Sequence, residues 1–194
     1  MSVLQLETLE SLIAFNKDFA QKRFSSQDQF MPMVVGYTSD NSQRIIVAGI
    51  FNNNQEKEMF FKTASLVFCL YSIDKYVVMT EAYGLRYTEE TKDEDPYEKY
   101  GSLAEHPNRM DLLSILAVNR HGAKMSSLEI LPDRSLLETD LATYSTVSGR
   151  MTELLPPADM KKLSQAERDQ RDLLQSLLSS MGSLRGSPIT LEDL

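Results

Sequence analysis

Hydrophobic and polar positions in the first part of the chain follow two different periods. From residue 3 to residue 24, apolar side chains recur at every third or fourth position, which predicts an amphipathic helix. Met33–Thr38 and Arg44–Phe51 are instead rich in β-branched and aromatic residues, and a polar Ser39–Ser42 segment separates them. Runs of that composition on either side of a short polar turn are typical of a β-hairpin.

Two further helices are predicted from capping residues and apolar faces. Asn52–Asn54 offers N-cap side chains, and the following Met59–Tyr71 is apolar on most sides, which indicates a largely buried helix. Later in the chain, Ser164 and Glu167 have the spacing of a capping box that opens a helix. That helix carries a stripe of apolar side chains: Leu173, Leu174, Leu177, Leu178 and Met181.

The middle of the chain favours strands. Lys75–Tyr83 is rich in β-forming residues, and Asp111–Asn119 with Lys124–Leu131 predicts a second hairpin around Arg120–Ala123. The alternation over Leu136–Thr146 is imperfect, so a further strand and a short helix both remain open there.

The predicted elements follow the order α-ββ-α-βββ(β)-α. Because each amphipathic element must bury one face, we expect an α+β fold in which an antiparallel sheet of about five to six strands is flanked by helices. Profilin-like and roadblock-like interaction domains have the same order of elements, which is an analogy of fold and not of function. A length of 194 residues suits one domain, assigned to residues 1–182, and residues 183–194 are expected to form a flexible C-terminal tail.

Composition favours a globular protein of the cytoplasm. Hydrophobic residues make up 42% of the chain and charged residues 25%, a balance that supports a packed core. The longest apolar stretch, Ala64–Leu70, is far shorter than the roughly 20 residues that cross a bilayer, and no export signal is recognisable. Cys69 is the only cysteine, which excludes an internal disulfide and a cysteine zinc site, and its place in an apolar helix favours a core side chain over a nucleophile.

The formal net charge of −8 makes nucleic acid an unlikely partner, because a phosphate backbone would be repelled. The nearest approach to a basic cluster is Lys17, Lys22 and Arg23. These three residues fall at the end of the first predicted helix, where cations complement the helix dipole.

Residues 84–110 are the least explained part of the sequence, since a connection of that length between two strands is uncommon unless it is functional or disordered. Its first half, Thr88–Tyr100, is acidic and is interpreted as a solvated loop. Its second half, Ser102–Arg109, is dense in chemically active side chains. With one residue of the preceding strand, this half supplies a candidate functional cluster: Glu81, Glu105, His106 and Arg109.

The cluster has a chemical and a structural interpretation. Pro107 holds His106 in an extended backbone conformation, and an imidazole beside Glu105 and Arg109 could carry protons or bind a metal. The commoner use of such residues is a loop held together by an arginine–carboxylate pair. Glu81 interrupts an apolar strand. If it faces the core, its carboxylate needs a partner, and if it faces solvent, it indicates no particular function. The sequence does not fix the register of the strand, so both orientations remain open.

Three motifs in this region resemble those of an uncharacterised family of phage and bacterial proteins: Thr80–Tyr83, Glu105–Arg109 and Val118–Gly122. The family has a Glu-Ala-aromatic strand end followed by a Ser-x-x-Glu-His-Pro-x-Arg motif. The resemblance covers about residues 55–132, and Tyr83 stands where many relatives have tryptophan. It implies a phage or bacterial origin, and the host cytoplasm if the protein is phage-encoded, but no activity.

The favoured hypothesis is a non-enzymatic accessory protein that binds a host or phage protein, because this function requires no catalytic motif. The acidic loop or the C-terminal apolar residues would provide the surface, and the last helix could also join two copies of the chain. The candidate partner-binding residues are Leu173, Leu177, Met181, Ile189, Leu191 and Leu194.

Two alternatives remain. One is a small enzyme or ligand-binding protein with a site around Glu81, Glu105, His106 and Arg109, which requires Glu81 to lie within about 10 Å of His106. The other is an acidic mimic of nucleic acid that inhibits a host protein. The sequence has no phosphate-binding glycine loop, no Gly-x-Ser-x-Gly and no His-Glu-x-x-His, and it has only 2 histidines, so neither a cofactor nor a metal is expected.

Overall fold

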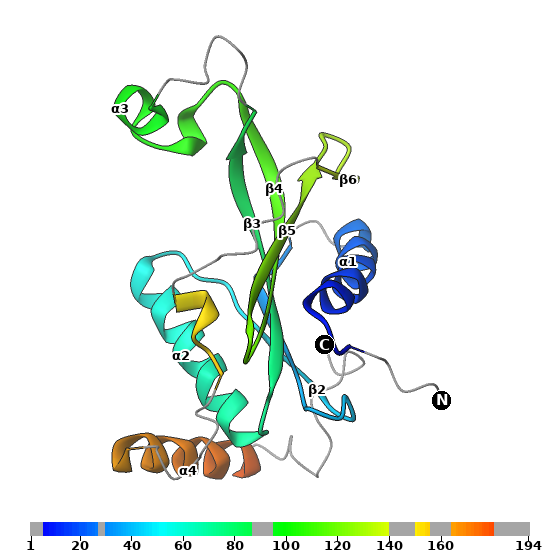
Figure 1. Ribbon diagram of the computed structural model, residues 1–194. Coiled ribbons are helices and arrows are strands. Elements are labelled where there is room, and N and C mark those ends of the chain that lie inside the picture. The colour runs from blue at the N-terminus through cyan, green and yellow to red at the C-terminus, as the bar shows by residue number, and fades with distance from the viewer. Residues whose placement is uncertain (1–5, 27–29, 87–94, 140–149, 156–163, 181–194) are drawn as a thin grey trace.

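The computed structural model describes residues 6–26, 30–86, 95–139, 150–155 and 164–180 (Figure 1). The elements in chain order are α1 (Leu9–Ser26), β1 (Met33–Tyr37), β2 (Arg44–Ala48), α2 (Asn54–Leu70), β3 (Lys75–Leu85), α3 (Pro96–Tyr100), η1 (Leu103–Glu105), β4 (Arg109–Asn119), β5 (Gly122–Ile130), β6 (Leu136–Glu138), η2 (Arg150–Thr152) and α4 (Gln165–Ser180). The predicted α+β class and element order are confirmed. The expected flexible tail, residues 183–194, lies outside the described residues.

The strands form one six-stranded antiparallel sheet in the order β2-β1-β3-β4-β5-β6. Helix α1 lies against one face of this sheet and α2 against the other, and α4 lies beside α2 (Figure 1). The sequence left a strand or a short helix open over Leu136–Thr146. Strand β6 occupies only its first three residues, and residues 140–146 are not described.

Each face of the sheet has its own hydrophobic core. Alternate residues such as Val77 and Met79 pack with α1, while Tyr76 and Val78 pack with α2. Because both faces are covered at this level, β1 and the first half of β3 are buried at every position. Helix α2 approaches β1 so closely that a Cβ on Gly36 would lie 2.6 Å from a ring carbon of Phe68.

Local hydrogen bonds explain where the first two helices begin. The Thr8 hydroxyl accepts from the Ser11 amide and the Ser11 hydroxyl accepts from the Thr8 amide, both at 3.1 Å, so α1 begins at Leu9 and not near residue 3. The Asn53 side chain accepts from the Glu56 amide at 2.9 Å and caps α2, as the asparagine run predicted.

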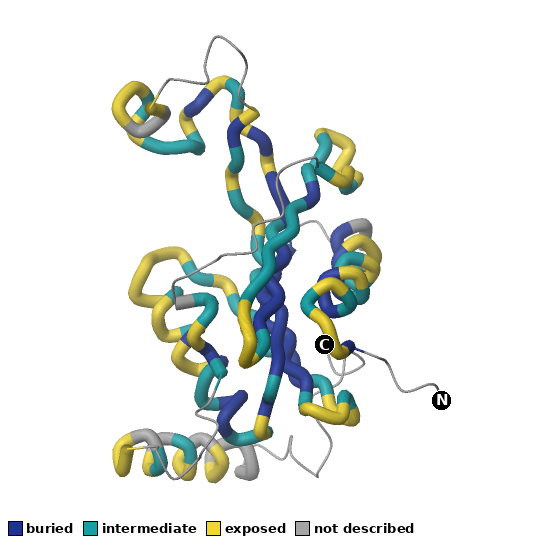
Figure 2. Tube along the Cα trace, in the orientation of Figure 1, coloured by how far each residue is buried: buried dark blue, intermediate teal, exposed yellow. Residues whose placement is uncertain are grey.

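Strands β3 and β4 continue well beyond the helices. Strand β1 pairs with Lys75–Met79 only, and the remaining Thr80–Leu85 pairs with Arg109–Ser114 of β4. These two six-residue segments are called the upper ribbon, and η1 and α3 lie at its tip (Figure 1). Figure 2 shows buried residues filling the middle of the sheet, whereas buried, intermediate and exposed residues are mixed along the upper ribbon. Both strands are two residues longer at this end than the sequence predicted.

Candidate functional site

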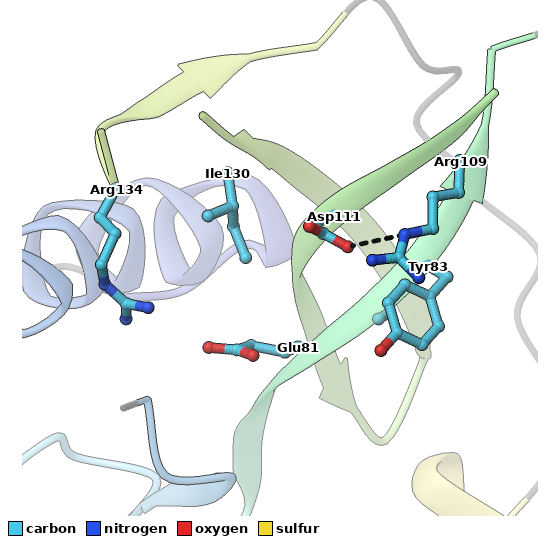
Figure 3. Close-up of a pocket in the computed structure, with 7 residues that line it drawn as sticks. Glu81, Tyr83, Arg109, Asp111, Ile130 and Arg134 are labelled. Carbon is cyan, nitrogen blue, oxygen red and sulfur yellow. Dashed lines mark ion pairs between the residues drawn. The ribbon is translucent and has the colours of Figure 1, made fainter. Parts of the chain in front are cut away.

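A pocket of about 340 Å³ lies on the upper ribbon, beside the turn between β5 and β6 (Figure 3). Strands β3, β4 and β5 and that turn all contribute side chains to it. The lining residues are Glu81, Ala82, Tyr83, Arg109, Asp111, Ile130 and Arg134. Two carboxylates and two guanidinium groups therefore surround a small apolar surface.

Strand register places the acidic residues on one wall. Glu81 lies opposite Leu113, and Tyr83 lies opposite Asp111. Residues two apart on a strand share a face, so Glu81 continues the face on which Met79 packs against α1. Glu81 is exposed even though Leu113 opposite it on β4 is buried in the α1 core, which answers the question that the sequence left open.

Arg109 is held by neighbours from three elements. Its Nε lies 3.9 Å from an Asp111 carboxylate oxygen, and its guanidinium lies 5.3 Å from the centroid of the Tyr83 ring. The same guanidinium donates a hydrogen bond to the carbonyl of Ala104 in η1. These contacts tie the tip of the ribbon to both of its strands.

Arg134 reaches the pocket from the turn that follows β5. The residue adopts a left-handed backbone with φ of 63°, and the neighbouring Asp133 carboxylate accepts hydrogen bonds from the Ser135 amide at 2.9 Å and hydroxyl at 2.6 Å. The Arg134 guanidinium lies 4.4 Å from the centroid of the Phe24 ring of α1. A cation–π contact therefore holds this side chain against the end of α1.

Glu81 differs from the other charged residues of the pocket. Figure 3 shows its carboxylate extending from β3 toward the Arg134 side, away from Arg109. Among the ion pairs of the described residues, none includes Glu81. The pocket therefore contains one exposed carboxylate that no described cation neutralises.

His106 and Glu105 lie outside this lining. The His106 side chain is buried, its ring meets Tyr100 edge-on with centroids 4.5 Å apart, and its Nδ1 accepts from the Asn108 amide at 3.0 Å. Glu105 is exposed at the end of η1. The structure thus brings Glu81 and Arg109 of the predicted cluster to one pocket and leaves the other two residues elsewhere.

The distance along the strand explains this separation. Glu81 is opposite Leu113, four residues beyond Arg109, which is about 13 Å at the usual strand rise of about 3.3 Å per residue. His106 lies further in the same direction, before β4 begins. Arg109 reaches the pocket because its long side chain extends over Tyr83, whereas the His106 ring packs edge-on against Tyr100.

The predicted partner-binding residues belong to α4 and to the chain beyond it. Leu173 is 61% exposed, so its side chain is available on the surface of α4. Leu177 belongs to the same helix, but its side chain is not described. Met181, Ile189, Leu191 and Leu194 lie outside the described residues, and their predicted role stays a prediction.

Comparison with protein-family models, with curated proteins and with solved structures found no match to this chain. The resemblance to a phage and bacterial family therefore depends on the three short motifs alone. Within the described ranges, no three histidine, cysteine, aspartate or glutamate side chains are grouped as a metal site would require. No helix in those ranges has the length and apolar character needed to span a membrane.

Proposed function

We propose that the protein is a non-enzymatic binding protein whose partner is another protein, and that the pocket of the upper ribbon accepts a basic side chain of that partner. The carboxylate of Glu81 carries this proposal. It is exposed in a pocket, and no described cation pairs with it. An incoming lysine or arginine would neutralise it, while Asp111 on the same wall adds a second acceptor.

Both arginines of the pocket already contact other residues, so the pocket is better suited to bind a cation than an anion. Arg109 already contacts Asp111, the Tyr83 ring and the Ala104 carbonyl, and Arg134 lies over the Phe24 ring. The formal net charge of −8 acts in the same direction, because it attracts basic surfaces and speeds their encounter with the protein.

The remaining lining suits a polypeptide. Ala82 and Ile130 offer an apolar surface for the aliphatic part of a lysine or arginine. Arg134 retains N–H groups that can donate to a main-chain carbonyl next to the basic residue. A volume of about 340 Å³ accommodates one long side chain with its flanking backbone and is near the lower limit for a small-molecule site.

The enzyme hypothesis loses its proton carrier in this arrangement. It needed the imidazole of His106 to meet Glu81, whereas the ring is buried edge-on against Tyr100 and its Nδ1 accepts a hydrogen bond from the Asn108 amide. The mimic hypothesis relied on an acidic run from residue 89 to residue 98. Residues 87–94 are not described, so that hypothesis stays a prediction.

A capture experiment with matched variants tests the proposal. The intact protein, Glu81→Gln and Glu7→Gln are immobilised at equal density and exposed to host lysate, and captured proteins are quantified by mass spectrometry. Glu7 is an exposed carboxylate of the segment before α1 and serves as the control. We expect Glu81→Gln to capture the main partner about three- to tenfold less than Glu7→Gln, which is the effect of one partly solvated ion pair.

The expected difference should shrink when the salt concentration is raised, because a partly solvated ion pair is screened. Equal capture by the two variants would remove the pocket from the binding surface. Capture by none of the three proteins would contradict the binding function itself.

A further inference from the structure

Strand β2 is one edge of the sheet, and the pattern of its hydrogen bonds shows which backbone groups point outward. The Thr38 amide donates to the Gln43 carbonyl and the Gly49 amide donates to the Pro32 carbonyl, at 3.3 and 3.1 Å. Both pairs follow the β1–β2 register, so odd-numbered residues of β2 bond inward to β1. The amides and carbonyls of Arg44, Ile46 and Ala48 consequently point away from the sheet, and no described strand pairs with them.

This edge lacks the features that usually prevent pairing with another strand. Its residues are Arg44-Ile45-Ile46-Val47-Ala48, with no proline, no lysine and no acidic side chain. The opposite edge is different, because β6 has only three residues and ends in Glu138, which pairs with Lys17 of α1 at 2.9 Å. Judged by the described residues, the β6 edge is protected and the β2 edge is not.

Apolar side chains flank the outer side of β2 on both faces of the sheet. On the α1 face, Phe15 and Phe19 are only half-buried, and the Arg44 guanidinium lies 5.9 Å from the Phe19 ring. On the α2 face, Phe60 packs against Phe51 with ring centroids 5.6 Å apart. Next to Phe51, the chain exposes a large apolar residue, Ile50, at 61%. An added strand would cover apolar surface on both faces.

We propose that a second copy of the chain pairs with this edge, with the two β2 strands antiparallel about a two-fold axis at Ile46. The outward groups then match by symmetry, since Arg44 of each copy lies opposite Ala48 of the other and Ile46 lies opposite its own equivalent. This register forms about six main-chain hydrogen bonds. On the other face, Ile45 lies opposite Val47 of the second copy, which is a favourable β-branched pair.

Charge and shape favour a second copy over an unrelated strand. Arg44 is the only charged residue of β2, and the two-fold register places it opposite a small, uncharged alanine, so no like charges face each other. The axis is perpendicular to the sheet, so each α1 would lie beside the other α1 and each α2 beside the other α2. The half-buried phenylalanines of each face then meet their own equivalents.

The mass of the 194-residue chain in solution provides the first test. Sedimentation equilibrium between about 1 and 100 µM is expected to show a mass rising from 22.0 kDa toward 44.0 kDa, which is 2 × 22.0. Arg44→Pro removes an outward amide and breaks no hydrogen bond to β1, so the β1–β2 pairing should persist while dimerisation weakens at least tenfold. Arg44→Ala loses the same side-chain contact with Phe19 but keeps the amide, and should weaken dimerisation less. Leu137→Lys alters an exposed residue of the opposite edge and should not change the mass.

Amide exchange provides a second test that requires no substitution. The amides of Arg44, Ile46 and Ala48 are expected to exchange more slowly as the protein concentration rises, whereas those of Ile45 and Val47 already bond to β1 and should not change. A monomer at 100 µM would overturn the proposal. It would also be overturned by a dimer that Leu173→Glu dissociates while exchange along β2 stays independent of concentration, because α4 would then be the interface.

Discussion

The phenol of Tyr76 connects strand β3 to the segment that follows β6, and its removal allows a quantitative test of that connection. The ring is fully buried in the core beneath α2. Its hydroxyl donates to the Met151 carbonyl at 2.7 Å and accepts from the Leu154 amide at 3.3 Å. Burial raises the pKa of this hydroxyl above its ordinary value, so it stays protonated and remains a donor at all ordinary pH values.

Tyr76→Phe keeps the ring and removes both hydrogen bonds. Loss of the hydrogen bond to the Met151 carbonyl costs about 1 kcal/mol of stability. The buried Leu154 amide, left without an acceptor, costs about 1 to 3 kcal/mol more, and this second cost falls if water reaches the loosened segment. We expect the free energy of unfolding to fall by about 2 kcal/mol. For a chain of this length, that change lowers the melting temperature by about 4–8 °C.

Chemical denaturation and amide exchange measure the effect, with Tyr71→Phe as the matched control. Tyr71 makes no hydroxyl hydrogen bond with the described residues, so its loss should change stability by less than about 0.5 kcal/mol. The Leu154 amide should exchange faster in Tyr76→Phe than in the control. Equal stability of the two variants, or unchanged exchange at Leu154, would show that the hydroxyl does not hold this segment.

Two further predictions follow from buried and charged hydrogen bonds. The buried Tyr37 hydroxyl donates to the Asn16 side-chain oxygen at 3.0 Å. Asn16→Leu removes this acceptor and should lower the free energy of unfolding by about 1–3 kcal/mol. In a double-mutant cycle, adding Tyr37→Phe should recover part of that loss. The Thr38 hydroxyl and then the Ser42 amide and hydroxyl lower the pKa of Asp40 from 3.8 to about 2. Since the folded-state pKa is the lower one, this carboxylate stabilises the fold above about pH 4, and the contribution is lost as the pH falls toward 2. An NMR titration that gives Asp40 a pKa near 3.8 would contradict it.

Helices and strands that depend on neighbouring residues could be predicted from the sequence. Features that depend on how one strand pairs with another could not. The cap at Asn53 and the apolar periodicity of α2 were sufficient to place that helix, because both signals lie within a few residues of the element. The start of α1 was placed too early, since apolar spacing continued before Thr8 while the reciprocal bonds with Ser11 set the boundary.

The pocket required information that the sequence expresses only through strand pairing. Glu81 and Arg109 were identified as candidates, but Tyr83, Asp111 and Arg134 were not assigned to a site. Asp111 meets Tyr83 only because β3 and β4 pair in that register, and Arg134 arrives through a turn after β5. The spacing of two between Arg109 and Asp111 was the available signal, because it places both side chains on one face of a strand.

The position of the upper ribbon explains how exposed charges coexist with a stable sheet. Where α1 and α2 cover the strands, β3 is buried at every position, and an unpaired carboxylate there would be severely destabilising. Beyond Met79, the Glu81 side chain of β3 is exposed to water while β4 still holds its backbone in register. The ribbon therefore presents charged side chains on a rigid strand pair, at a position where substituting them should change binding far more than folding. This separation makes Glu81→Gln an informative variant, since a loss of capture without a loss of stability can arise only at the surface of the pocket.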